Sequence, residues 1–213
     1  MMKTEWTKES LQAFEEDIKQ AFLDRQIKGP IHLSGGNENQ LIALFKHVSV
    51  TDYVLTTYRN HYHCLLKGMP PNVLKRHILE GRSMYLCDWD YGILSSAIVG
   101  GMLPIAVGLA LGLHRRGSDD HVWCFIGDMG AETGGFHEAT KYAGKHGLPI
   151  TFLIEDNGLS TNTPTQKVWG NPRNISGICS PYTIGNDYGA DVRYYQYERT
   201  VPHTGAGQWV TFS

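Results

Sequence analysis

The chain has 213 residues, of which 41% are hydrophobic and 19% are charged. This length and composition predict one soluble domain with a substantial core. Lys and Arg number 19 and Asp and Glu number 21, so the formal net charge is −2 with neutral histidines. That balance argues against nucleic acid or an anionic membrane as the main partner. The four cysteines are widely spaced, which predicts neither a disulfide framework nor a zinc site and fits a reducing cytoplasm.

The beginning of the chain predicts two helices. Residues 8–25 place their apolar side chains on one helical face, with Glu and Lys between them. We expect this helix within an N-terminal helical arm spanning residues 1–30, where it covers the domain or meets a partner. A turn at Gly35-Gly36 precedes a second helical stretch that runs through Phe45.

A strand and a short helix are expected next. Residues 53–57 predict a strand that delivers Tyr58 and Arg59 to its end. Pro70-Pro71 predicts the start of a short helix that ends at Glu80, because proline is well tolerated in a first helical turn.

Residues 97–113 form an uncharged and mostly apolar run that approaches the shortest length of a transmembrane helix. The run is rich in glycine and contains Pro104 near its middle. A helix that is apolar all round is buried in protein or in lipid. The charged and polar N-terminus does not resemble a signal peptide, so we predict a buried central helix and no membrane span.

Two short apolar runs, VWCFI at residues 122–126 and ITFLI at residues 150–154, predict buried strands. If these strands are parallel neighbours joined by the intervening helix, the residues that follow them emerge at one edge of the sheet. Asp128 and Asn157 are those residues, and ligands of open α/β sheets bind at that carboxyl edge. The predicted fold class is therefore α/β, with a mostly parallel sheet flanked by helices.

The last part of the chain predicts one long loop and one strand. Residues 160–189 are rich in Asn, Pro, Thr, Ser and Gly, which indicates an extended loop. Residues 192–197 resume as a strand, and a tail follows through Pro202-His203.

The pair of polar residues after the two apolar strands suits a hard cation. A carboxylate, an amide oxygen and nearby backbone groups are ligands for Mg²⁺, which keeps few protein ligands and bridges to substrate phosphates. We therefore predict a metal and diphosphate site around Asp128 and Asn157. The alternatives are that Asp128 only caps a helix and that Asn157-Gly158 only forms a turn.

Several motifs carry a resemblance to a known family. Residues 127–165 (GDMGAETGGFHEATKYAGKHGLPITFLIEDNGLSTNTPT) resemble the thiamine-diphosphate motif, in which a Gly-Asp-Gly triplet precedes an asparagine pair. The segments IHLSGGNEN, TTYRNHYHCLLKG, GRSMYL and AIVGGMLPIAVGLALG precede it in the order of one family. Over residues 18–165 the chain is similar to the alpha subunit of the first component of 2-oxo-acid dehydrogenase complexes, of the pyruvate and branched-chain type.

The resemblance implies a thiamine-diphosphate-binding fold, with residues 1–213 forming a single diphosphate-type domain. It implies that Asp128 and Asn157 bind Mg²⁺ through their side chains and Leu159 through its carbonyl oxygen. Tyr58 and Arg59 match a family pair that contacts the diphosphate. Arginine suits this task because its planar fork can donate two bonds to phosphate oxygens. The alternative for Arg59 is a solvated surface charge.

Further positions are assigned by the same resemblance. The backbone of Met129, Gly130 and Ala131 is expected to donate amides to the phosphates, where the next helix begins. The backbone around Ala97 and Val99 is expected to meet the aminopyrimidine ring.

Two histidines are the predicted catalytic residues. His61 belongs to a Tyr-Arg-x-His pattern and is expected to face the active-site entrance. His203 lies where a later strand of the family leads into a loop that carries a histidine. For both, an ordinary loop histidine is the alternative.

The chain departs from the family pattern at several points. Met129 replaces the second glycine of the triplet, which requires an ordinary backbone conformation and a thioether turned away from the phosphates. Asp156 replaces the first asparagine of the pair and adds a carboxylate near the expected metal. Tyr85 stands where many members have histidine. The chain ends at Ser213, short of a typical alpha subunit, which puts complex-type activity in doubt.

The resemblance also implies partners. The cofactor carries the difficult chemistry, a carbanion that attacks a 2-oxo acid. Proton loss from the cofactor needs a glutamate that belongs to a separate pyrimidine-binding domain. We therefore expect a beta-type subunit to complete the active site in a two-alpha, two-beta assembly, with little activity from the chain alone. A lipoyl-bearing acyltransferase is the implied acceptor of the acyl group.

Two other functions stay open. One is the diphosphate-binding half of a split transketolase-like enzyme or of a non-oxidative 2-oxo-acid decarboxylase. The other is a non-catalytic module that binds the cofactor or a partner.

Overall fold

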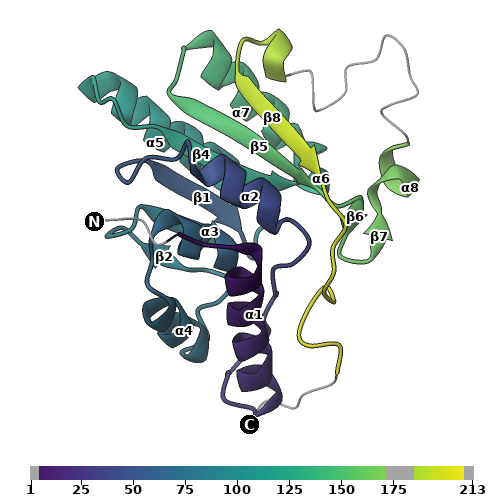
Figure 1. Cartoon of the computed structure of the whole chain (residues 1–213). Coiled ribbons are helices and arrows are strands. Elements are labelled where there is room, and N and C mark those ends of the chain that lie inside the picture. The colour runs from purple at the N-terminus through teal and green to yellow at the C-terminus, as the bar shows by residue number, and fades with distance from the viewer. Residues whose placement is uncertain (1–4, 171–184, 209–213) are drawn as a thin grey trace. The chain divides into compact units, whose positions relative to one another are not determined.

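The computed structural model describes residues 5–170 and 185–208 (Figure 1). The chain divides into two compact units, which we describe separately. The helical unit comprises Met1–Val50, Tyr58–Ala97 and Glu198–Ser213, and the sheet unit comprises Thr51–Thr57 and Ile98–Tyr197. That residues 1–213 form a single diphosphate-type domain stays a prediction.

The sheet unit contains four neighbouring parallel strands in the order β1-β4-β5-β8. All seven residues of β5 are buried, which explains why its sequence is a continuous apolar run rather than an alternating one. The predicted α/β class and the parallel pairing of the two apolar strands are confirmed. The four strands are β1 (Tyr53–Thr57), β4 (Val122–Gly127), β5 (Ile150–Asp156) and β8 (Asp191–Gln196).

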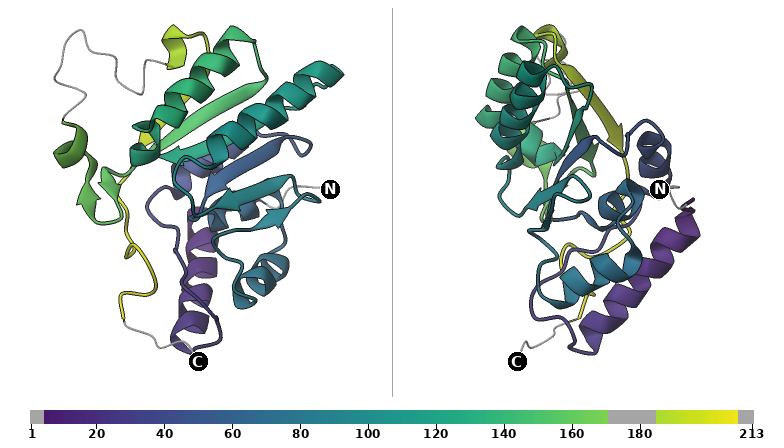
Figure 2. Two further views of the ribbon diagram at one scale, coloured as in Figure 1. Left: turned by 180° about the vertical axis from the view of Figure 1, so that it is seen from behind. Right: turned by 90° about the vertical axis from the view of Figure 1, so that its left-hand side faces the viewer.

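Helices of the sheet unit lie on one face of these strands, as Figure 2 shows for α5 (Met102–Arg116) and α7 (Gly134–Lys145). Phe136 of α7 meets Phe152 of β5 edge to face, with ring centroids 6.0 Å apart. Such aromatic pairs add to the stability gained by burial. Shorter elements follow the two central strands: α6 (Asp128–Ala131), β6 (Leu159–Ser160), β7 (Thr163–Pro164) and α8 (Thr165–Trp169).

Two predictions about this unit need correction. The apolar run at residues 97–113 becomes helical only from Met102, and Pro104, Ile105 and Gly108 are exposed, so α5 is a half-buried helix. The uncharged, small residues of this segment led us to expect full burial. Only one side of α5 is buried, and it carries Met102, Leu103, Ala106, Ala110 and Leu113. In the described ranges, no helix combines the length and the apolar character that crossing a membrane requires.

The predicted loop at residues 160–189 is partly ordered into elements. It contains the β6–β7 hairpin and α8, while residues 171–184 lie outside the described residues. Short hairpins carry no periodic apolar pattern, which is why the composition of this segment indicated only a loop.

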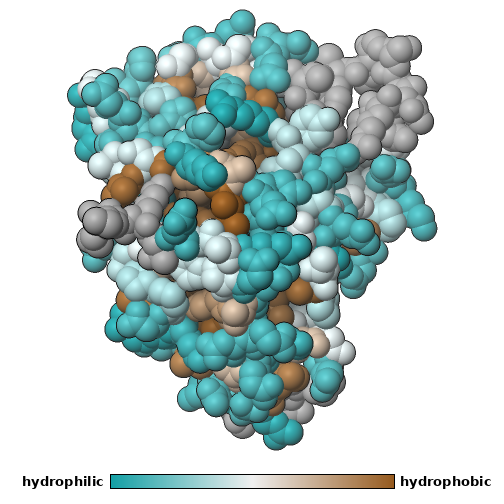
Figure 3. Space-filling model, viewed as in Figure 1, coloured by the Kyte–Doolittle hydropathy of each residue, from teal (hydrophilic) through white to brown (hydrophobic). Residues whose placement is uncertain are grey.

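The helical unit is built around α1 (Lys8–Leu23), whose start is fixed by a capping box between Thr7 and Ser10. Leu11 and Ile18 are fully buried, whereas the side of α1 that faces the viewer in Figure 3 is mainly hydrophilic. This amphipathic helix confirms the prediction for residues 8–25. The other elements are α2 (Glu38–Phe45), α3 (His61–Lys67), α4 (Pro71–Leu79) and the antiparallel strands β2 (Cys87–Asp88) and β3 (Ile93–Ser96).

The close approach of α7 to residues 188–190 gives a testable prediction. A Cβ atom at Gly144 would lie 2.4 Å from the Tyr188 carbonyl oxygen and 2.6 Å from the Ala190 nitrogen. Because both neighbours are backbone atoms, Gly144→Ala should lower the free energy of unfolding by roughly 1–3 kcal/mol. Thermal unfolding measures this change.

Gly108→Ala in α5 is the matched control. A Cβ atom there meets nothing within 4 Å. Alanine is the better helix former, so this variant should be more stable than the parent by roughly 0.5–1 kcal/mol. Equal effects of the two substitutions would contradict the close packing of α7.

Candidate functional site

The carboxyl ends of β4 and β5 place two predicted site residues at one edge of the sheet. Gly127 pairs with Glu155 in the parallel register, so the two strands end level with one another. Asp128 begins α6 directly after β4, and Asn157 follows directly after β5. The expected juxtaposition of these strand ends is therefore present.

Asp128 lies in a site that disfavours an isolated negative charge. Only 3% of the residue is exposed, and its Oδ2 accepts a hydrogen bond from the Thr165 hydroxyl. Burial raises the pKa of the Asp128 carboxyl, and the nearby charge of Asp156 raises it further. A cation at this edge would reverse that cost, because it stabilises the ionised form.

Asn157 is held in one orientation by two hydrogen bonds. Its Nδ2 donates to the Tyr197 hydroxyl at 3.0 Å, and its Oδ1 accepts from the Leu159 amide at 3.0 Å. An amide oxygen has two lone pairs, so Oδ1 keeps the capacity to accept a second ligand. The turn interpretation is also correct, since Gly158 has a φ of 71°.

Asp156 replaces the first asparagine of the family's pair. Its carboxylate stabilises the backbone at the end of β5. Its Oδ1 accepts from the Gly158 amide at 2.9 Å, and its Oδ2 accepts from Gln196 Nε2 at 3.0 Å. The carboxylate therefore fixes the turn after β5 and links it to β8. It still acts on Asp128 through its charge.

Met129 meets the first condition that its replacement of glycine requires, an ordinary backbone conformation. It lies in α6, and among the described residues outside glycine only Arg25 and Thr161 have a positive φ. The Trp169 indole nitrogen lies 3.1 Å from the thioether sulfur and donates to it. The methionine side chain is thus held against α8.

The acidic character of this edge extends to Glu132. Burial raises the pKa of its carboxyl, and the charge of Asp128 adds to that effect.

Across residues 5–170 and 185–208, no group of three or more His, Cys, Asp or Glu side chains is arranged to hold a metal ion. The set expected here contains one carboxylate, one amide and one backbone carbonyl. These are oxygen donors of the kind that Mg²⁺ uses when phosphates and water supply the remainder.

The helical unit brings together three other candidate residues. Tyr58 and His203 lie with ring centroids 5.9 Å apart. His32, which the sequence analysis did not select, lies between them, 4.4 Å from the Tyr58 ring and 5.0 Å from the His203 ring. Burial and then the charge of Arg59 lower the pKa of His32 to about 3, and the same two causes lower the pKa of His203. Both imidazoles are therefore neutral at neutral pH.

Arg59 is buried rather than solvated, so the surface-charge alternative is wrong. Its Nη1 donates to the Leu33 carbonyl, and its Nη2 donates to the His203 carbonyl at 3.2 Å. These two bonds to backbone carbonyls fix the orientation of the guanidinium group. Its contact with a diphosphate stays a prediction.

His61 has a different environment from the entrance position that was expected. The residue is fully buried in the helical unit. Its Nδ1 lies 3.0 Å from Glu15 Oε1, and its Nε2 lies 2.9 Å from Ser83 Oγ. With both ring nitrogens occupied, His61 joins α1 to α3 and the loop at Ser83. Whether it also acts in catalysis is untested.

The last two predicted cofactor contacts, Ala97 and Val99, are exposed in the bend and turn that precede α5. Sequence reasoning missed Thr165, Trp169 and Tyr197 as neighbours of the site. Tyr197 follows β8, so the same strand-edge argument that selected Asp128 and Asn157 could have found it. The positions of Thr165 and Trp169 depend on the β6–β7 hairpin, which has no periodic apolar pattern in the sequence.

The buried charge of Asp128 predicts a gain of stability on its removal. A carboxyl whose folded pKa is raised destabilises the fold at a pH above that pKa, and the cost vanishes below the ordinary value of 3.8. Without ligands, Asp128→Asn should therefore raise the melting temperature at pH 7 by about 2–4 °C. The gain should fade as the pH is lowered toward 3.8.

Asp191→Asn is the control, for which we expect a change in melting temperature of the opposite sign. Burial raises the pKa of Asp191, but hydrogen bonds from Arg193 and Thr151 outweigh burial and lower it overall. This variant should melt below the parent at pH 7, with the difference lost as the pH falls through the lowered pKa. If Asp191→Asn were stabilised and Asp128→Asn destabilised, the conclusion that the Asp128 charge destabilises the fold and the Asp191 charge stabilises it would be wrong.

Comparison with known proteins places the chain among enzyme subunits. The chain is 30% identical over 164 residues to the alpha subunit of acetoin:2,6-dichlorophenolindophenol oxidoreductase from Bacillus subtilis (strain 168), covering 72% of this chain and 49% of that protein. It is 30% identical over 200 residues to the alpha subunit of the pyruvate dehydrogenase E1 component from Rickettsia prowazekii (strain Madrid E), covering 88% and 58%. For the corresponding subunit of Rickettsia bellii (strain RML369-C) the identity is 32% over 165 residues, covering 72% and 50%.

The chain thus spans about half the length of the relatives it matches. The family model for the dehydrogenase E1 component matches residues 7–173, from the first helix to beyond the strand edge that carries Asp128 and Asn157. This match covers well over half of the chain, and it agrees with the resemblance found in the motifs. The chain belongs to the dehydrogenase E1 component family.

Proposed function

We propose that this chain is an alpha-type subunit of a thiamine-diphosphate- and Mg²⁺-dependent dehydrogenase that acts on a 2-oxo acid or on acetoin. Membership of the dehydrogenase E1 component family and similarity to alpha subunits named for pyruvate and for acetoin support this function. The single observation that carries the cofactor assignment is the buried Asp128 carboxyl at the edge where Asn157 also emerges, because burial and the charge of Asp156 disfavour its ionised form.

The residues present fit the metal. Asp128 would bind Mg²⁺ through its carboxylate, Asn157 through Oδ1 and Leu159 through its carbonyl oxygen. The hydrogen bonds of Thr165 to Asp128 and of Tyr197 to Asn157 would hold these ligands in place. Supporting bonds of this kind are needed around a metal site, because they fix the orientation of the first ligands.

For the diphosphate, we propose the backbone of Met129, Gly130 and Ala131 in the sheet unit and, on the family resemblance, the side chains of Tyr58 and Arg59 in the helical unit. The placement of the Met129 thioether against Trp169 supports the first part, because the side chain is turned into a contact within the protein. The two carbonyl bonds of Arg59 support the second part, because a fixed guanidinium loses little entropy on binding phosphate. The backbone at Ala97 and Val99 is proposed for the aminopyrimidine ring.

Bound thiamine diphosphate supplies the carbanion and the electron sink that decarboxylation or acyl transfer requires. The chain itself binds and orients it. His203 is neutral at neutral pH because burial and Arg59 lower its pKa, so its imidazole can accept a proton from a substrate group. His61, with both nitrogens occupied, is better placed to hold α1 and α3 than to exchange protons.

We further propose that a beta-type subunit completes the active site in a two-alpha, two-beta assembly, and that a lipoyl-bearing acyltransferase receives the acyl group. The match to subunits named alpha supports a beta-type partner. Activity of the chain alone should accordingly be very low.

Calorimetric titration of thiamine diphosphate into the full chain tests the cofactor assignment. With Mg²⁺ we expect binding that tightens when a beta-type subunit is added. Asp128→Ala should weaken binding by at least about 100-fold, because it removes a metal ligand from the site. Omission of Mg²⁺ from the parent should have a comparable effect.

Asp119→Ala is the matched control. Asp119 is an exposed aspartate that precedes β4, at the opposite end of the strand from Asp128. Its removal takes away the same charge but should leave the affinity unchanged. Absence of metal-dependent binding in every combination would sink the thiamine assignment.

Met129→Gly tests whether the departure from the family triplet obstructs the cofactor. Because the thioether is held by Trp169, we expect the affinity for thiamine diphosphate to change by less than about threefold, with a loss of stability of about 1 kcal/mol from glycine in α6. A tenfold or greater gain in affinity would show that the methionine side chain occupies cofactor space.

A further inference from the structure

The helical unit contains a cavity of about 330 Å³ whose lining includes none of the residues assigned above to cofactor, metal or catalysis. Its wall is formed by α1, α2, the segment after Leu33 and residues 200–202 with Ala206. A volume of this size lies within the range of small-molecule sites. Polar and apolar side chains share the wall, with Leu33, Val201 and Pro202 on the apolar side.

Glu38 presents a fixed carboxylate to this cavity. Only 2% of the residue is exposed. Its Oε1 accepts hydrogen bonds from Gln12 Nε2 at 3.3 Å, from the Gly36 amide at 3.1 Å and from the Tyr62 hydroxyl at 3.2 Å. No donor among the described residues reaches its Oε2. Three bonds on one oxygen therefore orient the group and leave the other oxygen for a ligand.

The charges around the cavity are unbalanced. Lys19 is the one ammonium group in the wall, and its Nζ lies 2.9 Å from both carboxylate oxygens of Glu16. The second buried carboxylate, Glu15, bonds to His61 and to the Ser34 amide. In the described part of the chain, Glu38 thus has no cationic partner. A buried carboxylate without a counter-ion is costly, so the site favours a positively charged occupant.

Ser34 supplies an independent observation. The residue is 2% exposed and lines the cavity, and its Oγ has no hydrogen-bond partner among the described residues. Buried hydroxyl groups in folded proteins are normally paired, so an unpaired one at a cavity wall indicates a missing ligand group. A hydroxyl oxygen accepts bonds from N–H donors, which agrees with the chemistry that Glu38 requires.

We propose that this cavity binds a small organic cation, a primary amine or a guanidine in its protonated form. The Glu38 carboxylate is the counter-ion, and the Ser34 hydroxyl accepts a second N–H bond. Leu33, Val201 and Pro202 contact the alkyl portion of the ligand. A metal ion fits the site less well, because its wall is partly apolar and no group of three acidic, His or Cys side chains occurs in the described ranges.

Calorimetric titration of the full chain with n-butylammonium and with agmatine tests this proposal, with 1-butanol as the uncharged comparison. We expect both cations to bind with a dissociation constant of about 1 mM or below, and 1-butanol to bind at least about tenfold more weakly. Glu38→Gln should weaken binding of both cations by at least about tenfold.

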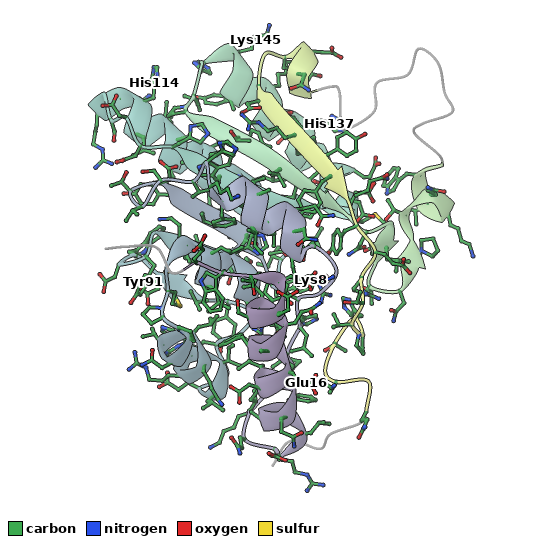
Figure 4. The ribbon with its side chains drawn as sticks, in the orientation of Figure 1. Lys8, Glu16, Tyr91, His114, His137 and Lys145 are labelled. Atoms are coloured by element: carbon green, nitrogen blue, oxygen red, sulfur yellow. The ribbon has the colours of Figure 1, made fainter. Side chains whose placement is uncertain are left out.

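Glu16→Gln is the matched control. Glu16, labelled on α1 in Figure 4, also lines the cavity, but its carboxylate is exposed and already bonded to Lys19. This variant removes the same charge and should change the affinity by less than about twofold. If both variants lost the same affinity for the cations, the effect would come from the net charge of the region and not from a contact with Glu38. That result would overturn the proposal.

Ser34→Ala tests the second proposed contact of the cation, and it can be used even if Glu38→Gln fails to fold. Because the hydroxyl is unpaired in the protein, its removal should leave the melting temperature unchanged but weaken cation binding by about three- to tenfold. Asp128→Ala should leave cation binding intact, which separates this site from the proposed thiamine site. No binding of either cation, or equal binding of 1-butanol, would mean that the cavity holds only water.

Discussion

The parallel pairing of β4 with β5 is the constraint on which the candidate site depends. Its register brings Gly127 level with Glu155, so the chain leaves both strands at the same edge. Asp128 and Asn157 both emerge at this edge, although the helix α7 separates them in sequence. The third parallel strand, β8, adds Tyr197 and Gln196 to the same edge, where they bond to Asn157 and Asp156. One backbone pattern thus positions both the candidate ligands and the groups that orient them.

Several carboxylates of this protein are buried, which costs desolvation free energy, and they differ in the groups that bond to them. Asp156 is satisfied by the turn after β5 and by β8, and Glu15 is satisfied by His61 and the Ser34 amide. Asp128 and Glu38, like Asp156, accept the hydrogen bonds described above from neutral donors, but each of these two also borders a proposed binding site. Neutral donors orient a carboxylate but do not neutralise it, so both sites favour a positive charge. In the sheet unit the oxygen donors suit a metal ion, whereas in the helical unit the apolar wall suits an organic cation.

The histidines show why residue type alone is weak evidence for catalysis. His61 belongs to the more recognisable motif, yet the structure buries it and occupies both of its nitrogens. His32 carries no motif of its own, yet it lies against Tyr58 and His203 with a buried Nδ1 that has no partner among the described residues. The difference lies in the environment, because burial and then the charge of Arg59 lower the pKa of the His32 and His203 imidazoles and keep both rings neutral.

The sequence by itself determined the four parallel strands, the α/β class, the amphipathic α1 and the pair Asp128 and Asn157. These depend on local apolar patterns and on the rule that parallel strands end at a common edge. The tertiary structure alone decided the half-exposed state of α5, the hairpin and helix within the predicted loop, the orientation of Met129 toward Trp169 and the cavity around Glu38. The hairpin pairs near neighbours, Leu159 with Pro164 and Ser160 with Thr163, whereas the other three depend on contacts between residues far apart in the chain. No local pattern encodes such contacts, because burial and charge balance are fixed only when the packed neighbours are in place.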